Sequence, residues 1–141
     1  MIFYFDTSAL VKLVLPEPGS ELASTLWRSG EPAASSILAY PEGRAGLAAA
    51  NRAGRIDKKT YARSLAEFEA LNEELISIGI DEHLARSAGD KAAQFGLRGY
   101  DAVHLATALN VGGELVVVTW DKDLHRAAEA TGLTVAGITN S

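Results

Sequence analysis

The chain contains no cysteine, one methionine and four prolines among its 141 residues. Because cysteine is absent, disulfide-linked folds and thiolate metal sites are excluded. No apolar run approaches the roughly 20 residues that a membrane-spanning helix needs, and the short run Ile2–Phe5 ends at Asp6. The N-terminus also lacks the basic start and long apolar core of a secretory signal. We therefore expect a cytoplasmic protein whose mature chain begins at Met1.

The composition is that of an ordinary globular protein, with 48% hydrophobic and 22% charged residues. The length predicts one domain covering residues 1–141. A net charge of −5 argues against a nucleic-acid partner, but positions 44–63 carry six lysines and arginines and a single acid. This basic segment is compatible with phosphate contact, with a solvated helix face and with a protein interface.

Apolar runs alternate with helical periodicity along the chain. Since the apolar runs have no polar face, the pattern predicts an α/β fold with a parallel sheet covered on both sides. Strands are expected at 2–5, 33–36, 76–80, 115–119 and 134–138. Helices are expected from Ser8 to before Pro16 and at 20–28, 36–51, 57–75, 81–95, 101–110 and 121–130. Pro41 is unfavourable inside a helix, which predicts either a kink or a helix that starts near Tyr40.

Four acidic residues stand where this fold would bring them together. Asp6 follows the first strand and Asp121 follows the strand at 115–119. Ligands of open parallel sheets bind beyond the carboxyl ends of the strands, so both carboxylates should face one crevice. Asp101 lies at the start of a helix, after a predicted turn at 98–100. Glu42 lies on an otherwise small and apolar helix face, so we expect it to point inward.

These carboxylates have two interpretations. As a cluster they repel one another unless a hard divalent cation compensates them, and Mg²⁺ or Mn²⁺ suits a site made of oxygen ligands. Such an ion activates water and stabilises charge on a phosphodiester under attack. Taken singly, an aspartate before a helix is an ordinary N-cap, worth about 1 kcal/mol. Two acids at strand ends together with an inward glutamate favour the shared site over coincidence.

The same residues resemble the motifs of the PIN-domain family, in particular the VapC-type toxins of bacterial toxin–antitoxin pairs. The matching segments follow the family's order and usual intervals over nearly the whole chain. They are FDTSAL at 5–10, Glu42 in the helix after Ser36, RGYDAVHLATA at 98–108 and VTWDKDL at 118–124. One departure is Pro41-Glu42-Gly43, which places two poor helix formers around the glutamate and bears on its orientation.

The resemblance implies a PIN-like three-layer α/β/α fold with a roughly five-stranded parallel sheet, and a Mg²⁺- or Mn²⁺-dependent endoribonuclease that hydrolyses RNA phosphodiesters. It implies that Asp6, Glu42, Asp101 and Asp121 form the catalytic and metal-binding site. Asp6 and Asp101 would bind the ion directly, Asp121 directly or through water, and Glu42 would position or activate the attacking water. It also implies a homodimer and a VapB-like antitoxin whose C-terminal segment blocks the acidic groove.

Four polar residues near these acids are expected to support the site. Ser8 is either a hydrogen-bond partner of a metal ligand or water, or a helix N-cap. Thr7 and Thr119 are candidates for orienting ligands, although a plain strand residue is the simpler interpretation of Thr119. Asp123 either touches a second cation or is an exposed acid in the first turn of a helix.

Basic residues near the acids have their own candidate roles. Arg98, Lys122 and Arg44 are the candidates for contacts with RNA phosphates. His104 lies one helical turn after Asp101, and a metal or acid–base role is conceivable because histidine titrates near neutrality. Since the four acids already supply oxygen ligands, we expect His104 to pack or hydrogen-bond structurally.

Three other functions use similar features. A phosphoacceptor signalling domain needs an early pair of acids and a lysine after a late strand, but this first strand ends in one acid and no lysine follows Lys122. A phosphatase with an aspartate nucleophile usually has a second aspartate where this chain has Ser8. The alternative that stays open is a non-catalytic PIN-fold module for RNA binding or protein interaction, against which the presence of all four acids argues.

Overall fold

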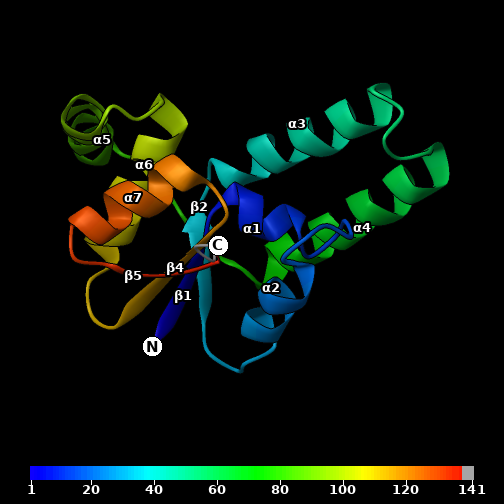
Figure 1. The fold of residues 1–141 in the computed structure, drawn as a ribbon, viewed down its shortest axis with the longest axis horizontal. Coiled ribbons are helices and arrows are strands. Elements are labelled where there is room, and N and C mark those ends of the chain that lie inside the picture. The colour runs from blue at the N-terminus through cyan, green and yellow to red at the C-terminus, as the bar shows by residue number, and fades with distance from the viewer. Residues whose placement is uncertain (138–141) are drawn as a thin grey trace.

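The computed structural model describes residues 1–137, which form one parallel sheet and seven helices (Figure 1). The strand order is β3-β2-β1-β4-β5, and every neighbouring pair is parallel. The strands are β1 (Ile2–Phe5), β2 (Ala33–Ser36), β3 (Ile76–Ile78), β4 (Leu115–Thr119) and β5 (Thr134–Gly137). The predicted five-stranded parallel sheet is confirmed. Strand β3 is shorter than the predicted 76–80, and Ile138 of the predicted last strand lies outside the described residues.

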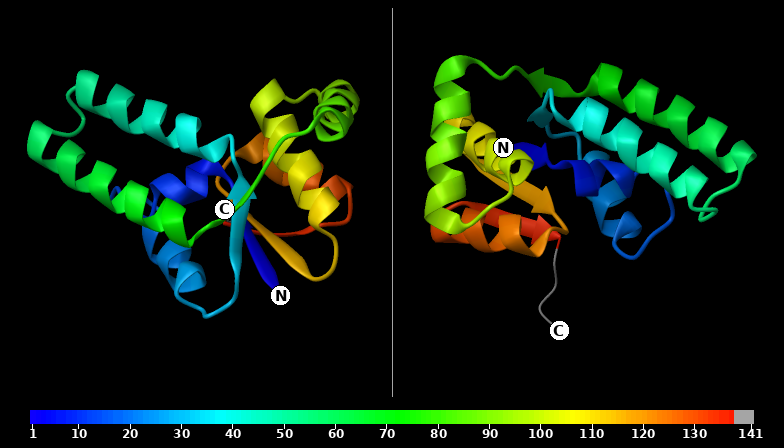
Figure 2. Two further views of the ribbon diagram at one scale, coloured as in Figure 1. Left: turned by 180° about the vertical axis from the view of Figure 1, so that it is seen from behind. Right: turned by 90° about the horizontal axis from the view of Figure 1, so that it is seen from above.

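Helices cover both faces of the sheet, as the two views of Figure 2 show. One layer holds α5 (Glu82–Phe95), α6 (Gly99–Val111) and α7 (Lys122–Ala130). The other holds α1 (Thr7–Val11), α2 (Ser20–Trp27), α3 (Ala39–Arg52) and α4 (Lys58–Glu74). Successive side chains of a strand point to opposite faces, so Tyr4 and Val117 enter the first core whereas Phe5 and Val118 enter the second. Both cores exclude water, which explains why the central strands β1 and β4 lack a polar face.

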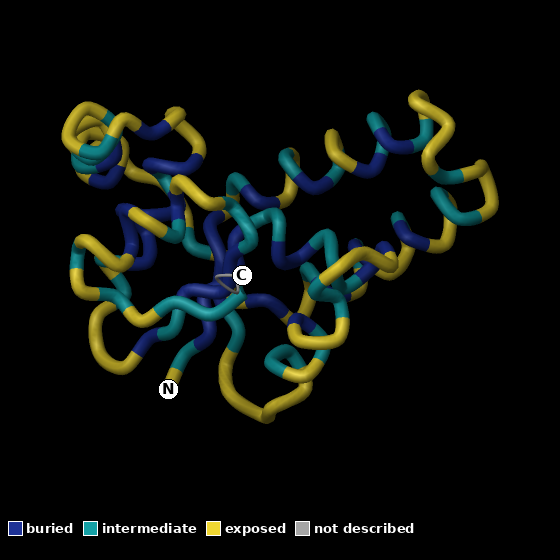
Figure 3. Tube along the Cα trace, viewed as in Figure 1, coloured by how far each residue is buried: buried dark blue, intermediate teal, exposed yellow. Residues whose placement is uncertain are grey.

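Helices α3 and α4 form an antiparallel pair that extends away from the sheet, and we call this pair the arm (Figure 1). Buried positions recur along both of its helices (Figure 3). At its base, buried Gly43 faces Phe68 so closely that a methyl group on Gly43 would overlap the phenyl ring. The glycine that looks unfavourable next to Glu42 therefore has a packing reason.

Two helix starts bear on the predicted site. Helix α3 begins at Ala39, so Pro41 lies in the first turn, where its missing N–H costs no intrahelical hydrogen bond. This agrees with the predicted start near Tyr40. Helix α6 begins at Gly99 with Arg98 as its N-cap, so the predicted turn at 98–100 is wrong and Asp101 lies within the first turn. Glycine costs a helix only about 1 kcal/mol, and the buried residues that follow outweigh it. No helix in the described 1–137 is long and apolar enough to cross a membrane.

Candidate metal-dependent nuclease site

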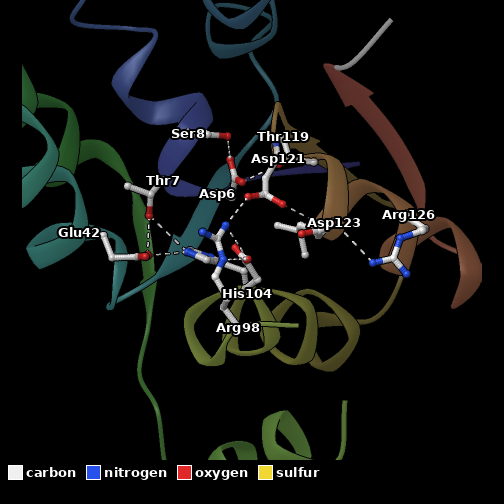
Figure 4. Close-up of polar contacts among 12 residues, drawn as sticks. Asp6, Thr7, Ser8, Glu42, Arg98, His104, Thr119, Asp121, Asp123 and Arg126 are labelled. Atoms are coloured by element: carbon white, nitrogen blue, oxygen red, sulfur yellow. Dashed lines mark hydrogen bonds and ion pairs between the residues drawn. The ribbon is translucent and has the colours of Figure 1, made fainter. Parts of the chain in front are cut away.

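The four predicted acids come from segments that meet at the carboxyl ends of the central strands. Strands β1 and β4 are neighbours, with Phe5 paired to Val118. Asp6 therefore leaves the sheet beside the segment that leads to Asp121. Glu42 follows the end of β2, and Asp101 comes from the first turn of α6. Figure 4 shows Asp6 and Asp121 near each other, with Arg98 reaching toward Asp121 and with Glu42 beside His104.

Asp6 is held by hydrogen bonds at both carboxylate oxygens. Its Oδ1 accepts from Ser8 Oγ at 2.7 Å and from the Ala9 backbone N–H at 3.0 Å, and its Oδ2 accepts from Thr119 Oγ1 at 2.5 Å. The residue is 3% exposed. Burial raises the pKa of Asp6, while nearby His104 and these hydrogen bonds act in the opposite direction. Asp6 is thus both the N-cap of α1 and a buried acid at the sheet edge, so the two interpretations of this residue are compatible.

Ser8 and Thr119 connect Asp6 to the segment after β4. Each hydroxyl donates to Asp6, and each also accepts a backbone N–H, from Trp120 at 3.1 Å and from Asp121 at 3.0 Å respectively. Thr119 is fully buried, so it is more than a plain strand residue. The N-cap of α1 is Asp6, not Ser8, so the N-cap interpretation of Ser8 is wrong and its hydroxyl contacts the acid instead.

Asp101 and Asp121 share the guanidinium group of Arg98. Arg98 Nη2 lies 3.2 Å from Asp101 Oδ2 and 3.0 Å from Asp121 Oδ2. The other oxygen of Asp121 caps α7 by accepting the Leu124 backbone N–H at 2.9 Å. Burial, and then the negative charge of Asp121, raise the pKa of Asp101 to about 6, although Arg98 opposes the shift. These two acids therefore carry more negative charge than one arginine neutralises.

Glu42 projects from the first turn of α3 and is half-buried, with 21% of its side chain exposed. Its Oε1 accepts from Thr7 Oγ1 at 2.7 Å and contacts His104 Nε2 at 2.9 Å. Burial alone would raise the pKa of Glu42, but the hydrogen bonds from His104 and Thr7 outweigh burial and lower it. His104 is 2% exposed and also bonds Tyr4, as the structural interpretation of this histidine predicts. Tyr4 was missed, and its only sequence signal is a hydroxyl inside an apolar strand.

Three predicted residues lie outside this contact network. Asp123 is exposed and pairs with Arg126 at 3.4 Å, which supports its interpretation as a first-turn surface acid. Lys122 is an exposed residue at the start of α7. Arg44 lies on the arm, where it contacts Glu69 at 3.4 Å. Asp123 and Arg44 thus pair with residues other than the four acids.

The acidic residues suit a divalent cation by their chemistry. Among residues 1–137 Asp6 forms no ion pair with a lysine or arginine, and it is 3% exposed. Burial raises the pKa of Asp6 and of Asp101 although hydrogen bonds on the first and Arg98 beside the second oppose the shift. In the part of the chain that the structure describes, no three acidic or histidine side chains are yet arranged as a metal-binding group. Arg98 lies between Asp101 and Asp121 instead.

Known proteins share both the sequence and the fold. A family model described as PIN domain matches residues 3–130. Ribonuclease VapC49 of Mycobacterium tuberculosis (strain ATCC 25618 / H37Rv) is 45% identical over 136 residues, which cover 96% of this chain and 94% of that protein. The fold is similar to the crystal structure of Mycobacterium tuberculosis VapC20, a sarcin-ricin loop cleaving toxin, with a TM-score of 0.70, 18% identity and coverage of 96% and 99%. It is also similar to a toxin–antitoxin complex from Klebsiella pneumoniae, with a TM-score of 0.63, 24% identity and coverage of 85% and 88%.

The fold, the order of the motifs and the near-complete alignment with a VapC ribonuclease agree with one another. The similarity to solved structures supports the three-layer α/β/α architecture. The 45% sequence identity supports membership of the VapC-type ribonucleases. The resemblance noted from the motifs is thereby confirmed. This chain belongs to the PIN-domain family and, within it, to the VapC-type ribonucleases.

Proposed function

We propose that this protein is a metal-dependent endoribonuclease that acts as the toxin of a toxin–antitoxin pair. The observation that carries the proposal is the linkage of three acids at one sheet edge. Thr119 connects Asp6 to the backbone of Asp121, and Arg98 connects Asp121 to Asp101. The 45% identity to a protein named ribonuclease VapC49, over nearly the whole of both chains, supports the same activity.

In this proposal Asp6, Asp101 and Asp121 hold the ion, and Glu42 completes the acidic site. We propose Mg²⁺, with Mn²⁺ as a substitute, because both favour oxygen ligands and neither needs the thiolates that this chain lacks. When bound, the ion polarises the scissile phosphate and lowers the pKa of water. Glu42 orients the attacking water and accepts its proton on the oxygen that Thr7 and His104 leave free.

The supporting side chains fix the acids before RNA arrives. Ser8 and Thr119 each hold one oxygen of Asp6, and Thr7 holds one oxygen of Glu42. Such outer contacts orient ligands and are nearly as important to a metal site as the ligands themselves. Asp123, which pairs with Arg126 on the surface, takes no part in this framework.

RNA phosphates are proposed to meet the cations around the acidic site. Arg98 is 59% exposed at its side chain and already sits between two acids, so it is placed to turn toward a phosphate once a metal ion neutralises them. Lys122 extends the positive surface at the start of α7, and Arg44 begins the basic segment of the arm. These contacts bind the backbone without reading the sequence.

Regulation is proposed to come from a protein partner. The fold is similar to that of VapBC-1 from nontypeable Haemophilus influenzae, which supports a VapB-like antitoxin as the partner. As the family resemblance implies, the C-terminal segment of that antitoxin would cover the acidic groove. We also propose a homodimer in the cytoplasm, where RNA is available.

The experiment compares RNA cleavage by the purified protein with Mg²⁺, with Mn²⁺ and with EDTA. Asp6→Asn should lower turnover on the order of 100-fold or more, because the loss of outer contacts alone typically costs 10- to 100-fold. Asp123→Asn is the matched control, since it makes the same substitution at an aspartate outside the network, and it should cleave like the wild type. Cleavage that persists in EDTA would refute the metal site. RNA binding without cleavage would favour the non-catalytic module.

A further inference from the structure

A buried chain of hydrogen bonds runs from the centre of the sheet to Glu42. Tyr4 Oη lies 2.8 Å from His104 Nδ1, and His104 Nε2 lies 2.9 Å from Glu42 Oε1. Thr7 donates to the same glutamate oxygen at 2.7 Å. Tyr4 is 0% exposed and His104 is 2% exposed. Side chains from α6 and α1 thus meet at a single oxygen of Glu42 on α3, and Tyr4 of β1 holds the α6 histidine from its other side.

The chemistry of the partners sets the direction of each hydrogen bond. An ionised carboxylate only accepts, so the proton between His104 and Glu42 belongs to His104 Nε2. In a neutral imidazole Nδ1 then accepts the Tyr4 hydroxyl hydrogen, and in an imidazolium both ring nitrogens donate. In either form Tyr4 holds the ring at Nδ1 while Nε2 presents a donor to Glu42.

We propose that His104, held by Tyr4, is a positioning residue of the nuclease that fixes Glu42 through its Oε1. Among the described residues, every hydrogen bond to the Glu42 carboxylate ends on Oε1. The second oxygen is left for the attacking water. This inference rests on the proposed function, in which Glu42 acts on that water.

The location of Glu42 explains why it needs such a support. It lies at the base of the arm, between Pro41 and Gly43, and its side chain is partly exposed. Ordering a glutamate side chain costs conformational entropy, and a shift of about 1 Å at a reacting group can cost roughly 100-fold in rate. Two donors on one oxygen remove most of that freedom before the substrate binds.

A purely space-filling role of Tyr4 and His104 does not account for the polar atoms that they bury. A leucine or phenylalanine would fill the same core without burying an imidazole and a phenol, whose polar ends need partners. Here both ring nitrogens of His104 are used, one by Tyr4 inside the core and one by Glu42 at its border. The polar atoms of His104 and Tyr4 are therefore explained by their connection to Glu42.

Two amide substitutions separate positioning from packing. Glutamine at position 104 places its amide nitrogen near the place of Nε2, whereas asparagine reaches only the place of Nδ1. We expect His104→Asn to lower kcat roughly 10- to 100-fold while the KM for RNA changes less than about twofold. His104→Gln should recover about tenfold of that loss. Thermal melts of both variants show whether activity merely follows stability.

The control is the same comparison in a Glu42→Gln background, where His104→Asn should reduce kcat no further because the two residues act as a unit. Equal kcat in the Asn and Gln variants, or an undiminished effect of His104→Asn in that background, would overturn the inference. Should His104→Asn fail to fold, Tyr4→Phe removes only one hydroxyl and should still lower kcat about 3- to 10-fold, and wild-type kcat in Tyr4→Phe would contradict the inference.

Failure of the inference and failure of the proposed site give different results. If Glu42→Gln lowers kcat while His104→Asn has wild-type kcat, the positioning role is wrong and the acidic site stands. If Glu42→Gln itself has wild-type kcat, the role of Glu42 in the proposed function is wrong and the inference fails with it.

Discussion

Replacing Gly43 by alanine should destabilise the protein although alanine is the better helix former. The added methyl group would overlap the ring of Phe68, which is 0% exposed. Overpacking of this kind costs about 1–3 kcal/mol. The change from glycine to alanine inside a helix returns about 1 kcal/mol. The free energy of unfolding should therefore fall by about 0–2 kcal/mol.

Gly46 supplies the matched control on the same helix. It is exposed, and a methyl group there would meet no atom within 4 Å. Gly46→Ala should thus gain the helix propensity without the overlap and stabilise the protein by about 0.5–1 kcal/mol. Because the propensity gain is common to both variants, the difference between them isolates the overlap, at about 1–3 kcal/mol.

Thermal unfolding measures this difference directly. For a domain of this size, 1 kcal/mol corresponds to about 3–4 °C, so Gly43→Ala should melt about 3–12 °C below Gly46→Ala. The overlap also lies next to Glu42, so RNA cleavage should fall in Gly43→Ala and stay unchanged in Gly46→Ala. Equal stabilisation of both variants would refute the packing explanation of the Pro41-Glu42-Gly43 segment.

Two further predictions concern charge. Because burial and Asp121 raise the pKa of Asp101 from 3.8 to about 6, its ionisation disfavours the metal-free folded state, and this penalty appears as the pH rises through that range and is complete above it. Asp101→Asn should therefore raise the free energy of unfolding by about 1–3 kcal/mol at pH 7 and by much less near pH 4. Urea unfolding measures this free energy, and an equal increase at pH 7 and pH 4 would contradict the prediction. Replacing Lys58 and Lys59 by glutamate should weaken RNA binding. It should also reduce by about 1.4 the slope of log binding constant against log salt concentration, because two phosphate contacts are lost. An equal effect of Arg86→Glu, an exposed control on α5, would show that the arm is not the contact.

Local chemistry accounts for what the sequence predicted well. Strand β1 is wholly apolar and β4 is apolar up to Thr119 because two helical layers cover both faces of the sheet, so these two strands stand out as short apolar runs. Asp6 and Asp121 come directly after such runs, and parallel topology sends both to one edge of the sheet. The interpretation of these acids as helix caps was also correct for Asp6 and Asp121, since each accepts a backbone N–H from the following turn. It was wrong for Asp101, because the N-cap of α6 is Arg98.

The remaining features depend on contacts between distant segments. Thr119 meets Asp6 across 113 positions, and His104 meets Glu42 across 62. Neither pairing leaves a periodicity in the sequence, so Thr119 looked like an ordinary strand residue. The ion pair between Arg98 and Asp121 also joins residues 23 positions apart, with all of α6 and β4 between them in the sequence, so it too has no local sequence signal.

The most direct test of the central claim is to map new RNA 5′ ends in cells after induced expression. Wild-type protein and Asp123→Asn should both produce discrete new ends, whereas Asp6→Asn should produce none because the buried acid at the end of β1 is lost. Expression of an antitoxin that binds the acidic groove should suppress the same ends. The same set of new ends in cells that express Asp6→Asn would contradict the proposed four-acid nuclease site.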